Sequence, residues 1–273
     1  MPPKMFETYV REAAVAADAA SDDYRRTAPD EANRTMMIVA LTSAVALTLI
    51  NFFAKDPAWV SGAVSGVGLN PVRVNSWLSS PDSAQLARLS VWTLVQLLAY
   101  VALPVLAIKF LIRKPIAEFG VAVRGIASHW RPYFLLFLVS LPVVIWASYS
   151  EAFLAKYPFY DLSPGEGLWP NMVVWWVMYA AQFVALEFFF RGFMVHGLKW
   201  RMGYAAIFVM VIPYNMIHFA KPLAEAFGAI LGGVTLGTLS LRTNSVWWGA
   251  ALHIAVAATM DIAALTHQGV LWP

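Results

Sequence analysis

The sequence predicts an all-α membrane protein, a bundle of about seven transmembrane helices with a cytosolic N-terminus. Hydrophobic residues make up 60% of the 273 residues and charged residues 13%, whereas soluble domains contain roughly 45–50% and 25%. Several apolar stretches also approach the roughly 20 residues that a helix needs to cross the hydrocarbon core of a bilayer. Because the chain has no cysteine, thiol nucleophiles and thiolate-bound zinc are excluded.

The elements follow from the alternation of polar and apolar segments. Residues 1–34 form a polar tail, which we expect to be cytosolic, helical and close to the membrane surface. Residues 55–87 are rich in Ser, Pro, Asn and Gly and are expected to form a loop. Residues 115–131 are too short and too mixed to cross, so we expect an interfacial connector there. The expected spans cover about 35–54, 89–112, 132–154, 169–200, 203–222, 223–241 and 245–265.

Two of these spans contain residues that are expected to affect their helix geometry or packing. Pro104 lies inside the second span and is expected to kink it or to be compensated locally. The sixth span carries two pairs of glycines four residues apart, and small residues at this spacing let helix backbones approach closely. The pairs are Gly228 with Gly232 and Gly233 with Gly237.

The distribution of the 19 Lys and Arg residues indicates the orientation. With the N-terminus inside, all but five of them fall on the cytosolic side, and those five are Lys55, Arg73, Arg88, Lys156 and Lys221. Cytosolic segments carry an excess of basic residues, so we predict seven spans with the N-terminus inside and the C-terminus outside. The expected location is a bacterial cytoplasmic membrane. The basic residues are not gathered into one arm, so the expected partner is the lipid bilayer and not nucleic acid.

The chain is expected to divide into four parts. The tail at 1–34 precedes N-terminal membrane helices and connectors at 35–168. A membrane core at 169–265 holds the candidate chemistry, and a short C-terminal tail at 266–273 follows it.

Ionisable residues within the last four spans are the candidates for chemistry. An ionisable group in the middle of a bilayer costs on the order of 3 kcal/mol, so one that persists usually faces the protein interior and has a partner. Glu187 and Arg191 are one helical turn apart in ALEFFFRGF, so both can lie on one face and form an ion pair. Such a pair can also serve helix packing alone. The candidates are Glu187, Arg191, His218, His253 and Asp261.

Glu187 and His218 are predicted to lie at the same depth. If the chain turns near Met202, Glu187 is 15 residues before the turn and His218 is 16 residues after it. At 1.5 Å per residue, each is roughly 23 Å from the turn. Asp261 follows His253 by eight residues, which places both on nearly the same helix face. One carboxylate with two histidines can activate water or hold a metal ion.

The segments LEFFFRG and YNMIH and the region of His253 resemble, in order and membrane context, the motifs of the CPBP family. These intramembrane proteases include CAAX prenyl endopeptidases and bacterial Abi proteins. The resemblance covers about 170–265, and the family pattern is E-E-x-x-x-R, then F-x-x-x-H, then H-x-x-x-N or D. It implies an all-helical membrane bundle with a water-filled cavity, and hydrolysis of a peptide bond near the membrane-associated end of a substrate.

The resemblance assigns roles to four residues. Glu187 matches the second glutamate, Arg191 the arginine, His218 the first histidine and His253 the second. It implies that a carboxylate and His218 activate water, while His253 stabilises the oxyanion.

Three positions depart from the pattern. Leu186 occupies the place of the first glutamate, Tyr214 that of the phenylalanine, and Ala257 that of the Asn or Asp. Tyr214 and Asp261 are candidate supporting residues around the site.

Two hypotheses follow. In the first, the chain is an intramembrane endopeptidase acting on a protein or peptide substrate, in which Glu187 is the general base together with His218, Arg191 orients Glu187, and His253 donates to the oxyanion. A variant of this hypothesis places a divalent metal such as zinc on Glu187, His218 and His253. In the second, the chain is a non-catalytic scaffold that binds a substrate-like helix or a lipid. The apolar residues at Leu186 and Ala257 motivate this alternative.

Overall fold

The described part of the chain consists of helices joined by turns and irregular segments, with one isolated β-bridge between Val121 and Ser245. The computed structural model describes residues 3–54, 56–80, 83–123, 125–162 and 166–271, with side chains from residue 7 onward. Six of the described helical stretches are long and apolar enough to cross a membrane, which confirms the all-α class and a multi-pass integral membrane protein. They are Pro29–Ala54, Ala84–Ile112, Ile126–Ala147, Asn171–Met216, Leu223–Thr243 and Trp247–His267.

The expected fourth and fifth spans belong to one apolar stretch that turns back on itself at Gly203. The chain has a φ of 57° there, a conformation that glycine adopts readily. The oxygen Oδ1 of Asp18 accepts a hydrogen bond from the backbone nitrogen of Tyr204 at 2.8 Å, and any Cβ on Gly203 would collide with this aspartate. The outgoing arm consists of α9 (Asn171–Glu187), the π-helical segment η6 (Phe188–His196) and α10 (Gly197–Met202), and the return arm of η7 (Gly203–Ala205) and α11 (Ala206–Met216).

The return arm is shorter than the fifth span expected from the sequence. Helix α11 has 11 residues and is therefore about 16 Å long, about half of the hydrocarbon thickness. It contains Pro213, and the chain leaves the helix from Ile217 in a series of turns that ends at Lys221. Two of the seven expected spans are thus the arms of one of the six apolar stretches, and the second arm ends several residues before the expected Pro222.

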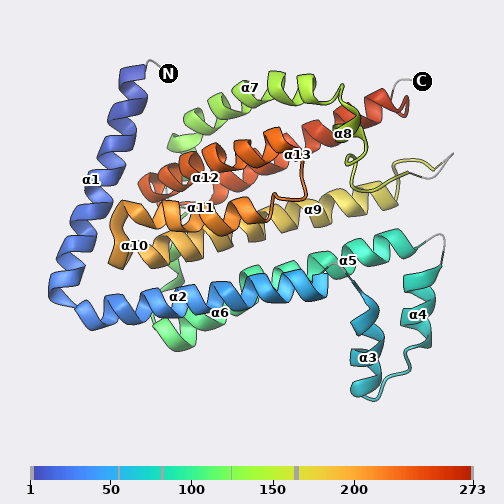
Figure 1. Ribbon diagram of the computed structural model, residues 1–273, viewed down its shortest axis with the longest axis horizontal. Coiled ribbons are helices and arrows are strands. Elements are labelled where there is room, and N and C mark those ends of the chain that lie inside the picture. The colour runs from blue at the N-terminus through green and yellow to red at the C-terminus, as the bar shows by residue number, and fades with distance from the viewer. Residues whose placement is uncertain (1–2, 55, 81–82, 124, 163–165, 272–273) are drawn as a thin grey trace. The chain divides into compact units, whose positions relative to one another are not determined.

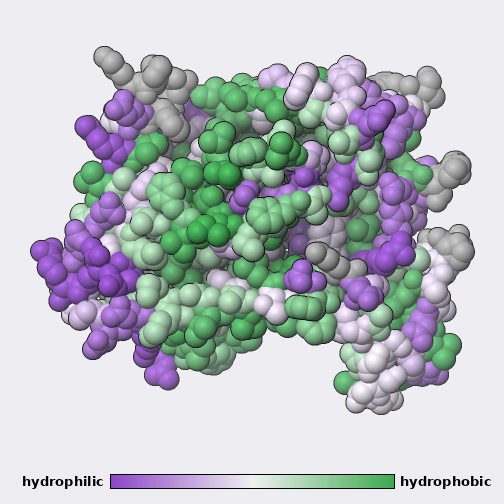
Figure 2. Space-filling view, in the orientation of Figure 1, coloured by the Kyte–Doolittle hydropathy of each residue, from purple (hydrophilic) through white to green (hydrophobic). Residues whose placement is uncertain are grey.

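The polar tail is helical, as expected. Helix α1 (Pro3–Thr27) contacts α10, η7 and α12, and Figure 1 shows it running across the direction of α12. Arg242 of α12 (Leu223–Thr243) pairs with Glu12 at 2.7 Å and lies 3.6 Å from the ring centroid of Tyr9. The purple side chains of α1 in Figure 2 show its polar surface. The first span begins earlier than expected, because α2 (Pro29–Leu49) starts at Pro29 and continues into the π-helical segment η1 (Ile50–Ala54).

The segment 55–87 contains two helices where a loop was expected. These are α3 (Ala58–Gly66) and α4 (Val72–Ser79). Each starts after a proline and next to a short polar side chain that caps it, a known signal for a helix start. The oxygen Oδ1 of Asp56 accepts from the nitrogen of Ala58 at 2.9 Å, and that of Asn70 accepts from Val72 at 2.9 Å.

The remaining spans agree more closely with the sequence. The second span runs through α5 (Ala84–Leu97), η2 (Leu98–Ala102), α6 (Leu103–Leu106) and η3 (Ala107–Ile112), so Pro104 is accommodated between two π-helical segments. Helix α7 (Trp130–Ala147) ends before the expected Leu154, which lies instead in the short helix α8 (Glu151–Leu154). Two 3-10 turns, η4 (Ile116–Phe119) and η5 (Ile126–His129), fill the connector. Helices α12 and α13 (Trp247–His267) lie within two residues of their expected ends.

The chain forms two compact units, each assembled from three stretches. The first comprises Met1–Ala44, Leu103–Leu136 and Leu186–Leu252, and the second comprises Val45–Ala102, Phe137–Ala185 and His253–Pro273. The four-part division expected from the sequence stays a prediction, and residues 272–273 of its C-terminal tail lie outside the described residues.

In the first unit, α11 and α12 pack closely because of glycines. A Cβ at Gly233 would lie 2.9 Å from Val211, and one at Gly237 would lie 2.9 Å from Ile207. These two glycines therefore permit the approach that their spacing predicted. Gly228 and Gly232 have nothing within 4 Å of a built Cβ, so they play no such part in the described structure.

The second unit has an aromatic core. The side chains of Met172, Trp175 and Leu265 are fully buried. Trp175 stacks on Tyr179 with ring centroids 4.8 Å apart and on Trp92 at 6.0 Å. Large apolar and aromatic side chains thus join α5, α9 and α13 in this unit.

Candidate active site

Glu187 and Arg191 form a buried ion pair where α9 passes into η6. The atom Nη1 of Arg191 lies 2.9 Å from Oε1 of Glu187, and the side chains are 0% and 1% exposed, respectively. The pairing predicted from their spacing is therefore present. Segment η6 is π-helical, and π turns within α-helices occur frequently at functional sites.

Gly249 of α13 allows the carboxylate of Glu187 to lie against the helix backbone. A Cβ built at this position would be 2.5 Å from Oε2 of Glu187, closer than non-bonded atoms approach. Any larger residue would therefore push the carboxylate away or shift the helix. The sequence analysis did not single out Gly249. The sequence feature that could have indicated it is its position one helical turn before His253, in GAALH.

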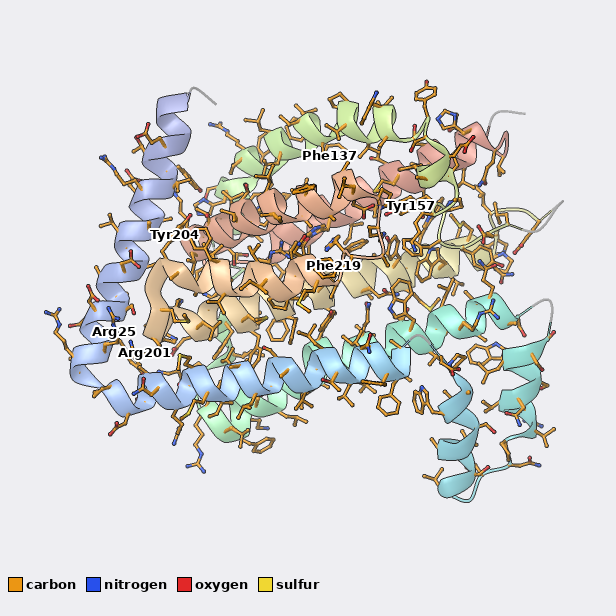
Figure 3. All side chains as sticks on the ribbon, in the orientation of Figure 1. Arg25, Phe137, Tyr157, Arg201, Tyr204 and Phe219 are labelled. Atoms are coloured by element: carbon orange, nitrogen blue, oxygen red, sulfur yellow. The ribbon has the colours of Figure 1, made fainter. Side chains whose placement is uncertain are left out.

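Tyr214 links the ion pair to His218. The guanidinium carbon Cζ of Arg191 lies 3.9 Å from the centroid of the Tyr214 ring, within the range of a cation–π interaction. On the other side, the imidazole of His218 meets this ring edge-on, with centroids 4.9 Å apart. Tyr214 is buried, whereas His218 is partly exposed in the turn after α11, next to Phe219, which is labelled in Figure 3. The ring of Tyr214, which stands where the family pattern has phenylalanine, therefore contacts both the guanidinium of Arg191 and the imidazole of His218.

A backbone carbonyl fixes the tautomer of His218. Its Nδ1 lies 2.8 Å from the carbonyl oxygen of Tyr214. A carbonyl oxygen only accepts hydrogen bonds, so Nδ1 carries the proton and Nε2 is the basic nitrogen of the neutral ring. A neutral imidazole in this tautomer can take a proton from water through Nε2.

The other two predicted residues belong to the second unit. The ring of His253 stacks on Phe183 with centroids 5.5 Å apart and planes inclined by 7°. Asp261 is fully buried, and its Oδ2 accepts a hydrogen bond from Nε1 of Trp176 at 3.0 Å. In this unit Asp261 thus joins α9 to α13 through an indole.

The three candidate metal ligands divide between the units, with Glu187 and His218 in the first and His253 in the second, so a metal site that uses all three stays a prediction. No three His, Asp or Glu side chains within the described ranges form a group that could hold an ion. In the first unit, a guanidinium already lies 2.9 Å from the carboxylate of Glu187, and a second cation there would be repelled. The chemistry available in this unit is therefore that of a carboxylate, a guanidinium, a phenol ring and an imidazole.

His196 is a buried polar residue to which the sequence analysis gave no role. It is fully buried on η6, with Nε2 3.1 Å from the hydroxyl of Ser240 and Nδ1 3.0 Å from Nζ of Lys199. Lysine can only donate, so Nδ1 accepts and Nε2–H donates to Ser240. Ser240 in turn donates to the carbonyl of Arg191 at 3.4 Å. This chain of bonds holds η6 against α12 behind the ion pair.

The part of the chain that contains the candidate site is similar to a known protein family. Residues 168–259 match the family model described as type II CAAX prenyl endopeptidase Rce1-like. This segment is therefore similar to Rce1-like domains. It contains Glu187, Arg191, His218 and His253, whereas Asp261 lies two residues beyond its end. The match supports assignment to the CPBP family of CAAX proteases that the motifs resemble, and no curated protein or solved structure matches the chain.

Proposed function

We propose that this chain is an intramembrane endopeptidase that hydrolyses a peptide bond near the membrane-associated end of a protein or peptide substrate. The observation that carries the proposal is the fixed tautomer of His218, which presents Nε2 as a base from the end of α11. The Rce1-like match over residues 168–259 supports the class of reaction. The N-in orientation, which rests on the distribution of basic residues, and the location in a bacterial cytoplasmic membrane belong to the same proposal.

In the proposed reaction, His218 activates the attacking water. Nε2 takes a proton from water as the water oxygen bonds to the carbonyl carbon of the scissile peptide, and the carbonyl oxygen becomes negatively charged. The imidazolium then gives this proton to the leaving amine as the carbon–nitrogen bond breaks. The carbonyl of Tyr214 holds Nδ1–H and thereby orients the ring through both steps. Stabilisation of the oxyanion by His253 stays a prediction that rests on the resemblance.

Glu187, Arg191 and Tyr214 are proposed as positioning residues. This differs from the sequence hypothesis that Glu187 is the base. One oxygen of Glu187 is 2.9 Å from Arg191, the other lies against Gly249, and the side chain is 1% exposed. In that environment Glu187 is suited to hold the guanidinium of Arg191 over the Tyr214 ring. This ring in turn supports the imidazole of His218.

The proposal is tested by looking for newly formed protein termini. Membranes from cells that express the wild-type chain or the His218→Gln variant are compared by terminal labelling and mass spectrometry. We expect new termini with the wild type and at least a 100-fold loss with the variant, because general-base catalysis contributes roughly 10²–10⁴-fold. The matched control is His129→Gln, in the connector outside the Rce1-like match. Equal cleavage by wild type and His218→Gln would remove His218 from the reaction.

A specific observation keeps a non-catalytic scaffold as the second candidate. Leu186 and Ala257 are apolar where the family pattern has polar groups, and Ala257 is buried. A scaffold of this kind would bind a substrate-like helix or a lipid without cutting a peptide bond. Absence of new termini with the wild-type chain, together with capture of an intact membrane peptide that depends on Tyr214, would favour this candidate.

A further inference from the structure

The hairpin formed by α3 and α4 has little support from the rest of the protein. The two helices contain 9 and 8 residues, and neither buries a single residue. Isolated helices shorter than about 12–15 residues are only marginally stable in water. Their helical state therefore depends on packing at their base and on the medium that surrounds their exposed residues.

The base of the hairpin is fixed to its own unit. Trp59, Val60 and Leu78 are partly buried against Val91 and Val95 of α5 and Ala54 of η1. The indole Nε1 of Trp59 donates to the carbonyl of Phe53 at 2.8 Å, and the two rings meet edge-on at 5.7 Å. The ends of the hairpin are thus held in place, whereas the large apolar side chains at its far end are exposed.

The far end of the hairpin is apolar and exposed. Val67, Leu69 and Val72 are 72%, 63% and 65% exposed. From Pro57 to Ser80 the sequence contains one charged residue, Arg73. Figure 2 shows the hairpin in white and green, the colours of weakly polar and hydrophobic residues, together with some purple. Three large apolar side chains at a single turn form a surface that water disfavours.

The position of the hairpin in the chain identifies what covers this surface. It connects the spans Pro29–Ala54 and Ala84–Ile112, so both of its ends lie at a membrane face. In Figure 1 both short helices run across the direction of α5, the orientation of helices that lie in the plane of an interface. Exposed Phe52 and Phe53 at the end of the first span continue the apolar surface toward the base of the hairpin.

We propose that the α3–α4 hairpin is an interfacial anchor whose tip inserts among the lipid headgroups and the upper acyl chains. Apolar side chains favour this boundary, and short helices with one apolar face lie in it. The near absence of charge removes the main cost of insertion. The partner is the lipid surface itself, and a second copy of the chain or another protein would be a different outcome of the test.

The absence of cysteine allows a direct measurement in the full-length chain. A single cysteine in Leu69→Cys is labelled with an environment-sensitive fluorophore, and the protein is placed in phosphatidylcholine vesicles. The matched control is the same label in Asp161→Cys, an exposed position in the loop before α9. We expect nitroxide lipids labelled on the upper acyl chain to quench the Leu69 label at least threefold more than the Asp161 label, and aqueous iodide to give the reverse order.

Two results would overturn the proposal. Equal quenching of both labels by iodide would place the tip in water. Protection of the Leu69 label from both iodide and nitroxide lipids would mean that protein covers it. A second variant adds Val67→Asp and Val72→Asp to Leu69→Cys and is expected to restore iodide quenching to the level of the control. Unchanged lipid quenching in this variant would show that the apolar tip does not hold the hairpin in the membrane.

Discussion

Glu187 and Asp261 are both fully buried carboxylates in apolar helices, but they have different partners. Glu187, in the first unit, lies 2.9 Å from the guanidinium of Arg191, which is one turn away on the same chain segment. Asp261, in the second unit, accepts a hydrogen bond at 3.0 Å from the neutral indole of Trp176, which is distant in the sequence. The contact described for Glu187 is thus with a full charge, and the contact described for Asp261 is with a dipole.

These partners suggest different roles: the Glu187–Arg191 pair positions other side chains, whereas the Asp261–Trp176 contact packs two helices together. Arg191 touches Tyr214, whose ring meets His218, so we expect a change at Glu187 to affect the proposed base. Asp261 joins two helices of an aromatic core through Trp176. A carboxylate buried in an apolar span is rare, and both residues share this property. Only their partners distinguish the proposed positioning role of Glu187 from the packing role of Asp261.

The largest effect is expected from Arg191→Met. This change leaves the Glu187 carboxylate buried without its cation, which costs about 3–5 kcal/mol. The measurement is the free energy of unfolding in mixed micelles for Arg191→Met, Glu187→Gln and the double variant. We expect the double variant to be more stable than Arg191→Met, because both charges have been removed together. Strictly additive losses would mean that the two side chains do not interact.

Gly249→Ala is expected to have the next largest effect. The added methyl group would lie 2.5 Å from Oε2 of Glu187, and overpacking of this kind costs about 1–3 kcal/mol. Gly228→Ala is the matched control, since nothing lies within 4 Å of its Cβ. The control should keep its stability or gain up to about 1 kcal/mol, because alanine favours the helix. Equal unfolding free energies for both variants would contradict the close approach at Gly249.

Trp176→Phe tests the partner of Asp261. It keeps an aromatic ring in the core but removes the indole N–H, and loss of a donor to a buried acceptor costs about 1–3 kcal/mol. We expect lower stability, measured by thermal unfolding, together with unchanged cleavage per folded molecule. A selective loss of cleavage at full stability would show that Asp261 takes part in the reaction.

Asp261→Asn should have the smallest effect. An amide oxygen can accept the same hydrogen bond from Trp176, so we expect a change below about 1 kcal/mol, the net value of a typical hydrogen bond. Circular dichroism during thermal unfolding measures this change. A loss as large as that of Arg191→Met would remove the distinction between the two carboxylates.

The membrane fold could largely be predicted from the sequence, because apolar length and charge distribution determine it. Helices α12 and α13 lie within two residues of their expected ends. The helices α3 and α4 were missed because their segment is short, weakly polar and rich in residues typical of loops. The early end of α11 was missed because hydropathy continues through Met216 and Ile217 although the backbone turns there.

Contacts in the candidate site could be predicted where the partners are close in the sequence, and they were missed where the partners are distant. The spacing of Glu187 and Arg191 was sufficient to predict their ion pair. The approach of Gly249 to Glu187 and the bond between Asp261 and Trp176 depend on long-range packing, which a single sequence does not encode as a periodic pattern. The same holds for buried His196, whose partner Ser240 comes from another helix.

The most direct test of the account compares cleavage by two variants of the purified protein. A membrane peptide identified from its new terminus is incubated in vesicles with His218→Gln or with the double variant Glu187→Gln/Arg191→Met. If His218 is the base and the ion pair positions it, His218→Gln loses cleavage at least 100-fold, whereas the double variant keeps a measurable kcat. A double variant without activity, beside a His218→Gln variant that still cleaves, would contradict the account and return the role of base to Glu187.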